Sequence, residues 1–157
     1  MIGALMISFG LGFVAGLRSM TAPAVVAWAS YIGWMNLSGS PLAFMASGWA
    51  VALFTLGALG EYVADLLPRT PARTSAFPLT VRIVTGLLTG ASVAIAGGFL
   101  LWVGLLGGAM GAIGGAFGGY RARVGLVRAL HVPDAAIAIP EDVIALGLGL
   151  LLACTLK

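Results

Sequence analysis

From residue 83 to residue 120 the chain contains no charged side chain. A helix that crosses the hydrocarbon of a bilayer needs about 20 apolar residues, so this stretch is long enough for two crossings. Residues 143–156 also lack charge, and Arg18 is the only charged residue before Glu61. Uncharged stretches of this length predict several membrane-spanning helices.

The composition excludes a soluble domain. Hydrophobic residues make up 61% of the chain and charged residues 8%, whereas about 25% of the residues of a soluble domain are charged. No polar stretch is long enough to form a separate soluble core. The sequence therefore predicts an all-α, polytopic membrane protein that forms a single integral membrane domain over residues 1–157.

The apolar segments predict about five crossings. Their expected ranges are 2–30, 44–67, 80–97, 101–120 and 139–155. The first range is too long for one straight crossing and contains Pro23, which lacks the amide hydrogen that a helix interior requires. Ser19 or Thr21 can cap a new helix that has Pro23 in its first turn. The alternative is therefore two shorter pieces, which gives six embedded segments.

The arginines indicate the orientation. Six of them flank the second-to-third and fourth-to-fifth connections: Arg69, Arg73, Arg82, Arg121, Arg123 and Arg128. Membrane proteins concentrate such residues on the cytoplasmic side, so five crossings place the N-terminus in the cytoplasm and the C-terminus outside a bacterial inner membrane. Because the basic residues lie at the ends of apolar segments, the net charge of +3 does not indicate nucleic-acid binding.

Glycine recurs every fourth residue in the fourth segment, at Gly107, Gly111, Gly115 and Gly119. This spacing leaves one helix face smooth and lets another helix backbone approach closely, as in a glycine zipper. Packing within one subunit is the favoured interpretation. The alternative is a homodimer or larger homo-oligomer through these glycines.

The first and fourth segments share a pattern that suggests an inverted repeat. Gly12-x-x-x-Gly16-x-Arg18 corresponds to Gly115-x-x-x-Gly119-x-Arg121. With five crossings the two segments run in opposite directions, which is the layout of many secondary transporters.

Arg18 is a candidate for a binding site because ionisable residues at membrane depth are costly and usually functional or paired. Ser19 and Thr21 lie beside it at the predicted helix break. Exposed backbone amides next to an arginine would suit an anion or a lipid headgroup. The alternative is that the Arg18 side chain only reaches the outer interface by snorkelling.

Glu61 and Asp65 lie four residues apart and therefore project from one face of the second segment. One interpretation is a proton or cation site at the inner mouth of a cavity, which we favour for Glu61. The other is an ion-pair network, which we favour for Asp65. Its expected arginine partners are Arg69, Arg82 and Arg121.

Glu141 and Asp142 follow Pro140 and are expected to lie at a helix N-terminus, where acidic side chains favour the helix dipole. The chain has one histidine, His131, and one cysteine, Cys154. We therefore expect no metal site, no cofactor and no catalytic residues, and we predict that the protein is not an enzyme.

Several motifs in order resemble a known family. They are GLRSMTAPA at 16–24, GEYVADLLPRTPAR at 60–73, RIVTGLLTGA beginning at Arg82, and GGAMGAIGGAFGGYRAR. Their order resembles the small bacterial membrane proteins grouped as domain of unknown function 4126. The resemblance implies a multi-helix membrane protein without an established activity. It also implies that the Arg18 region, the Glu61–Asp65 pair and Arg82 belong to one shared design.

Polar residues beside a broken helix predict a small transporter or channel-like protein for a small solute or ion, with Arg18, Glu61 and Asp65 lining a polar site. The alternative is a non-transporting protein, a lipid-binding or assembly factor, in which these charges only hold helices together. Membrane lipids are expected partners in both cases. Transport needs a hydrated cavity that reaches Glu61 or Arg18, whereas a scaffold would keep them paired and dry.

Overall fold

A computed structural model describes residues 2–65 and 74–157. In this part of the chain the fold is entirely helical, as predicted. The helices are α1 (Ile2–Leu17), α2 (Thr21–Tyr31), the short 3-10 helix η1 (Ala43–Ala46), α3 (Gly48–Asp65), α4 (Ala76–Ala96), α5 (Leu101–Leu130) and α6 (Asp134–Cys154). By length and composition α4, α5 and α6 can each cross a membrane, and α1 is a shorter apolar helix.

The first predicted segment, 2–30, is two helices rather than one. α1 ends at Leu17, and α2 begins at Thr21 after a break. Pro23 is the third residue of α2, where its missing amide hydrogen costs no intrahelical hydrogen bond. The two-piece alternative is therefore correct, and the described chain has six α-helices instead of five.

The other boundaries differ at the end that carries the arginines. α4 begins at Ala76 rather than 80, and α5 continues to Leu130 rather than 120. α6 begins at Asp134 and includes Pro140. The expectation that Glu141 and Asp142 start this helix is therefore wrong. Residues 66 and 67, the predicted end of the second segment, lie outside the described residues.

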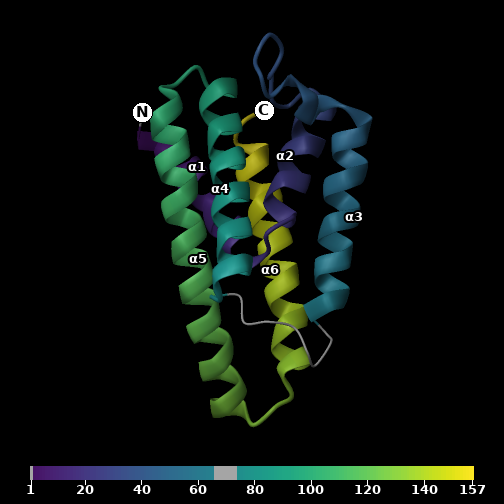
Figure 1. The fold of residues 1–157 in the computed structure, drawn as a ribbon, viewed down its shortest axis with the longest axis vertical. Coiled ribbons are helices and arrows are strands. Elements are labelled where there is room, and N and C mark those ends of the chain that lie inside the picture. Colours follow the sequence, from purple (N-terminus) through teal and green to yellow (C-terminus); the bar gives the residue numbers. More distant parts are fainter. Residues whose placement is uncertain (1, 66–73) are drawn as a thin grey trace.

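Successive α-helices alternate in direction, as Figure 1 shows, so both termini lie at one end of the bundle. The five-crossing count predicts termini at opposite ends of the bundle, whereas they lie at the same end because the first segment reverses direction at its break. We call the opposite end, where the α5–α6 turn lies, the arginine end.

The α5 glycines contact α1 of the same chain. A Cβ added at Gly111 would collide with the carbonyl oxygen of Phe9, and one at Gly115 would collide with that of Phe13. A Cβ added at Gly107 would lie 3.1 Å from that of Ser8. The space beside these glycines is thus occupied by α1 of the same chain, so a second copy cannot pack against them.

The contacts also fix the relative direction of α1 and α5. Gly12 lies against Gly108, whereas Gly16, further along α1, lies against Ala112 and Gly115. Residue numbers rise together on both helices, so α1 and α5 are parallel. The inverted repeat, which requires them to run in opposite directions, is wrong.

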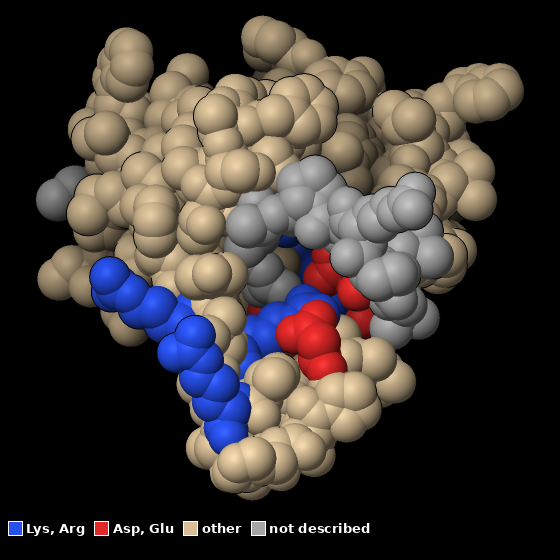
Figure 2. Space-filling view, turned by 60° about the horizontal axis from the view of Figure 1, so that its bottom comes forward, with Lys and Arg blue, Asp and Glu red and all other residues tan. Residues whose placement is uncertain are grey.

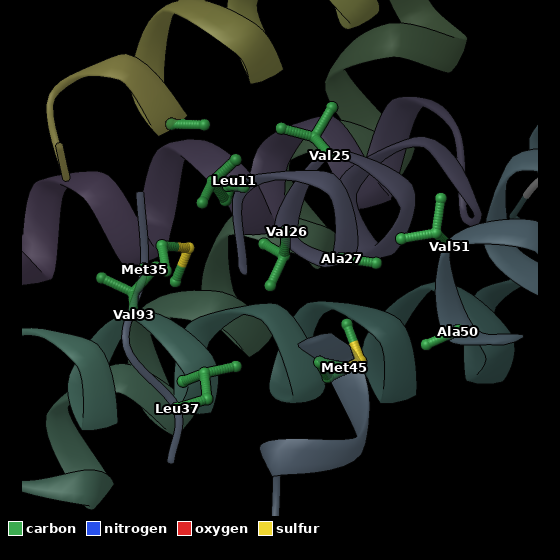
Figure 3. Packing of buried hydrophobic residues seen from close by; sticks show 12 residues of the cluster. Leu11, Val25, Val26, Ala27, Met35, Leu37, Met45, Ala50, Val51 and Val93 are labelled. Carbon is green, nitrogen blue, oxygen red and sulfur yellow. The ribbon is translucent and has the colours of Figure 1, made fainter. Parts of the chain in front are cut away.

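The hydrophobic core lies nearer the termini and joins α1, α2 and α4 (Figure 3). Leu11, Val26 and Val93 come from these three helices and are fully buried. Met35 and Met45, from the α2–α3 connection, close the same cluster. α3 contributes Ala50 and Val51, from its first turn, to this core and packs chiefly on α2. Much of the rest of its surface is exposed.

Candidate functional site

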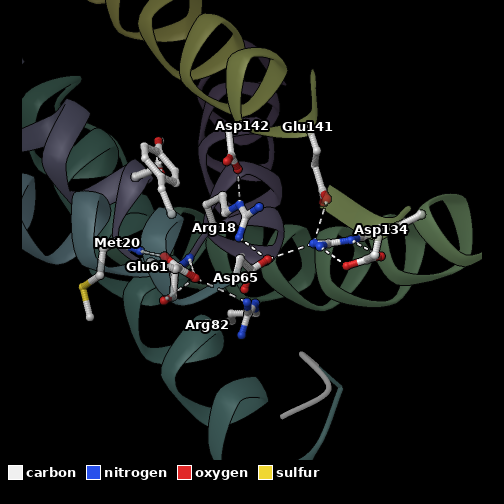
Figure 4. A network of polar contacts seen from close by, with 12 residues as sticks. Arg18, Met20, Glu61, Asp65, Arg82, Asp134, Glu141 and Asp142 are labelled. Atoms are coloured by element: carbon white, nitrogen blue, oxygen red, sulfur yellow. Dashed lines mark hydrogen bonds and ion pairs between the residues drawn. The ribbon is translucent and has the colours of Figure 1, made fainter. Parts of the chain in front are cut away.

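Every acidic side chain of the protein lies near the arginine end, together with three arginines (Figure 4). We call this group the charge cluster. Its members are Arg18, Glu61, Asp65, Arg82, Arg123, Asp134, Glu141 and Asp142. Figure 2 shows acidic and basic side chains gathered in a hollow at this end of the molecule. Ion pairs therefore connect the end of α1 with α3, α4, α5 and α6.

Arg18 lies at the break between α1 and α2 and is completely buried. Its guanidinium pairs with Asp65 at the end of α3 and with Asp142 of α6. Snorkelling to the outer interface is therefore the wrong interpretation. A buried arginine is tolerated only when carboxylates compensate its lost hydration, so these pairs tie the end of α1 to α3 and α6.

Glu61 provides the cap that α2 lacks in its own sequence. Its carboxylate accepts hydrogen bonds from the backbone amides of Ser19 and Met20, both at 2.9 Å. The Ser19 hydroxyl donates a third at 3.0 Å. The first amides of a helix have no intrahelical partner and attract negative charge. A carboxylate from α3 thus satisfies the amides of the N-cap residue Met20 and of Ser19 before it. The hydroxyls of Ser19 and Thr21 bond Glu61 and Tyr62 instead of capping α2.

Arg82 satisfies the other side of the break. Its Nε donates to the carbonyl oxygen of Gly16 at 3.0 Å, and its Nη2 donates to Glu61 at 3.3 Å. The last carbonyls of a helix lack intrahelical donors, so the guanidinium completes the end of α1. Glu61 and Arg82, predicted as site residues, therefore support the helix break jointly.

Sequence reasoning missed the residues that complete the cluster. Arg123 donates to Asp65 at 2.8 Å through Nη1 and to Asp134 at 2.9 Å through Nε. Its Nη1 also lies 3.6 Å from Glu141. The positive-inside pattern accounts for Arg123 by topology alone and indicates no partner for it. Asp134 and Glu141 lie seven residues apart and therefore on the same face of a helix. This spacing is the signal that could have identified them as joint partners of an arginine.

The predicted partners of the acidic pair need correction. Asp65 pairs with Arg18 and Arg123, and Glu61 pairs with Arg82. Arg121 is exposed and forms no ion pair with a described residue. Arg69, another predicted partner, lies outside the described residues.

An apolar groove of about 190 Å³ opens between α2, α3 and α6, next to the charge cluster. It is lined mainly by Ala24, Val25, Ala58, Leu59, Leu146 and Leu150. At one end the hydroxyls of Thr21 and Tyr62 lie 2.8 Å apart in a hydrogen bond. The Arg18 guanidinium carbon lies 5.8 Å from the centre of the Tyr62 ring, so Tyr62 stands between the groove and the cluster.

Within the described ranges, no three histidine, cysteine or acidic side chains are arranged to hold a metal ion. Every described carboxylate of the cluster instead faces a guanidinium. The chemistry of the site is therefore charge pairing and hydrogen bonding at a helix break.

Comparison with known proteins gives no match: no family model, curated protein or solved structure corresponds to this chain. The resemblance to domain of unknown function 4126 therefore stays a prediction.

Proposed function

We propose that the protein is a small membrane transporter in which the charge cluster closes one side of a solute site. The supporting observation is that Arg18, paired with Asp65 and Asp142, joins three separate elements beside an apolar groove. In this proposal the groove between α2, α3 and α6 holds the solute. The ion pairs and the Thr21–Tyr62 hydrogen bond form the closed gate.

A purely structural role does not require the ion pairs of Arg18 with Asp65 and Asp142. Replacing a buried ion pair by apolar residues is often neutral or stabilising, whereas ionisable groups at membrane depth are usually functional. Opening would need movement of the Asp65 end of α3, a helix that packs chiefly on α2 and whose buried core residues, Ala50 and Val51, lie at its other end. Breaking the ion pairs of Asp65 with Arg18 and Arg123 would release this end of α3.

The groove favours a solute with an apolar body over a bare ion. Two of its polar groups are already paired with each other, since Trp28 Nε1 donates to Thr55 Oγ1 at 3.1 Å. The Thr21 and Tyr62 hydroxyls are likewise joined. Few polar atoms are therefore left to replace the hydration shell of an ion.

The second candidate is the non-transporting scaffold. It is favoured by the complete burial of Arg18 and by the role of Glu61 as the cap of α2. In that case the cluster only holds the helices together, and the groove contains lipid.

Cysteine accessibility distinguishes the two functions without knowledge of the solute. Cys154 is the single cysteine, so Cys154→Ser gives a clean background for Ala58→Cys, which lines the groove. In proteoliposomes, a charged, membrane-impermeant thiol reagent is added from the arginine side. Transport predicts that Asp142→Asn accelerates labelling of the groove cysteine about tenfold, the equivalent of about 1.4 kcal/mol in gate closure.

Ala52→Cys is the matched control. Ala52 is exposed on α3 but does not line the groove, so its labelling should not respond to Asp142→Asn. Equal labelling of the groove cysteine with and without Asp142→Asn, in protein that stays folded, would support the scaffold instead.

A further inference from the structure

The outer face of α5 changes from apolar to basic along its length. Leu106, Met110 and Phe117 point away from the bundle and are 61%, 63% and 40% exposed. Arg121 and Arg128 follow at spacings of four and seven residues. Because such spacings return to the same side of a helix, all five lie on one outward stripe. We call it the α5 stripe.

The two arginines of the α5 stripe are exposed, and neither forms an ion pair or hydrogen bond with a described residue. The reason lies in the charge cluster, which takes up all five acidic side chains of the protein. Figure 2 shows basic side chains on the outer surface, apart from the hollow. The stripe therefore ends in positive charge that no carboxylate of the chain neutralises.

The position of these arginines along α5 corresponds to the headgroup region. α5 has 30 residues, or about 45 Å at 1.5 Å per residue, against about 30 Å of hydrocarbon. Its uncharged part ends at Tyr120, which is 41% exposed, and tyrosine is enriched at membrane interfaces. Arg121 begins the part of α5 that extends beyond the hydrocarbon.

We propose that the α5 stripe binds one anionic phospholipid. An acyl chain lies along Leu106, Met110 and Phe117, and the phosphate lies between Arg121 and Arg128. Guanidinium groups suit phosphate because they donate two parallel hydrogen bonds. A second copy of this chain is a poor occupant, since two such stripes would bring unneutralised arginines together. This site lies apart from the groove and does not depend on the proposed function.

The test is a lipid titration of the full protein in detergent, read as thermal stabilisation. Dioleoyl phosphatidylglycerol is compared with dioleoyl phosphatidylcholine, which has the same chains and no net charge. For R121Q/R128Q, we expect half-saturation with phosphatidylglycerol to need about 30-fold more lipid. That change corresponds to about 1 kcal/mol per arginine. The response to phosphatidylcholine should not change.

K157Q is the matched control, because Lys157 is an exposed cation at the terminal end of the bundle (Figure 1). It should keep the wild-type response to phosphatidylglycerol. Inorganic phosphate alone, or dihexanoyl phosphatidylglycerol with short chains, should stabilise far less, because neither covers the apolar part of the stripe.

Salt provides a test that needs no variant. At about 1 M salt the Debye length is about 3 Å, so the preference of the wild type for phosphatidylglycerol should be lost. An R121Q/R128Q protein that keeps this preference would overturn the proposal. So would an equal loss in K157Q, equal stabilisation by inorganic phosphate, or a preference that persists in salt.

Discussion

Glu61 stabilises the break between α1 and α2 from a different helix. Its carboxylate accepts from two backbone amides and one hydroxyl, and it also pairs with Arg82. Sequence reasoning selected this residue because a carboxylate at membrane depth is costly, and it favoured a proton or cation site over the ion pair with Arg82 that the structure shows. It could not predict the capping role, because the amides that Glu61 meets lie about 40 residues away in the chain and become available only at the break.

Glu61→Gln should therefore destabilise the protein by about 3–5 kcal/mol, the usual cost of breaking one side of a buried pair. The amide keeps the shape but removes the charge that Arg82 and the amides of Ser19 and Met20 require. Asp134→Asn is the matched control, because the Asp134 side chain is 62% exposed and also pairs with an arginine. Exposed pairs contribute about 0–1 kcal/mol. Chemical unfolding in detergent measures both, and equal losses would contradict the capping role.

At the scale of elements, α1, α4 and α5 form the tightest part of the bundle because glycines remove the side chains between them. Gly90 and Gly104 approach so closely that a Cβ on either would meet the other's carbonyl oxygen. The four-residue spacing predicted a close approach in α5. It could not identify the partner helices, because a smooth face fits any helix. In the structure both α1 and α4 pack against glycines of α5.

Gly111→Leu and Gly115→Leu should prevent folding, because each added side chain would meet the backbone of α1 and overpacking cannot be relieved by side-chain movement. Gly118→Leu is the matched control on the same helix, where an added Cβ meets nothing within 4 Å. The measurement is the yield and the melting temperature of monodisperse protein. Comparable melting temperatures for Gly111→Leu and Gly118→Leu would show that the α5 packing is wrong.

At the scale of the whole molecule, one short break changes the topology. Pro23 indicated it, and two short pieces were an alternative, but residue patterns could not decide whether the chain bends or reverses. The reversal depends on contacts that form only in the fold, namely those of Glu61 and Arg82 with the two helix ends. The membrane-helix class followed from composition, whereas the charge cluster depends on the topology.

The even number of helices has a consequence for orientation. If the arginine end faces the cytoplasm, as arginine-rich connections usually do, both termini of this chain lie on the opposite face of the membrane, as in Figure 1. We expect alkaline phosphatase fused after Lys157, or before Met1 behind an export signal, to be active, and green fluorescent protein fused after Lys157 to stay dark. Reporters that place the two termini on opposite faces would contradict the six-helix arrangement.

If the protein transports a solute as proposed, the ion pairs of Arg18 with Asp65 and Asp142 hold α3 against α6 and so keep the gate closed. The most direct measurement is the distance between spin labels on exposed positions of these helices, Val63 and Ile144, in the Cys154→Ser background. A second label pair at Val84 of α4 and Met110 of α5, both exposed, serves as the control. Electron–electron resonance should give one narrow distance for each pair in the otherwise wild-type protein. Asp142→Asn should add a longer distance for the first pair only, whereas an unchanged distribution in folded Asp142→Asn protein would contradict the claim.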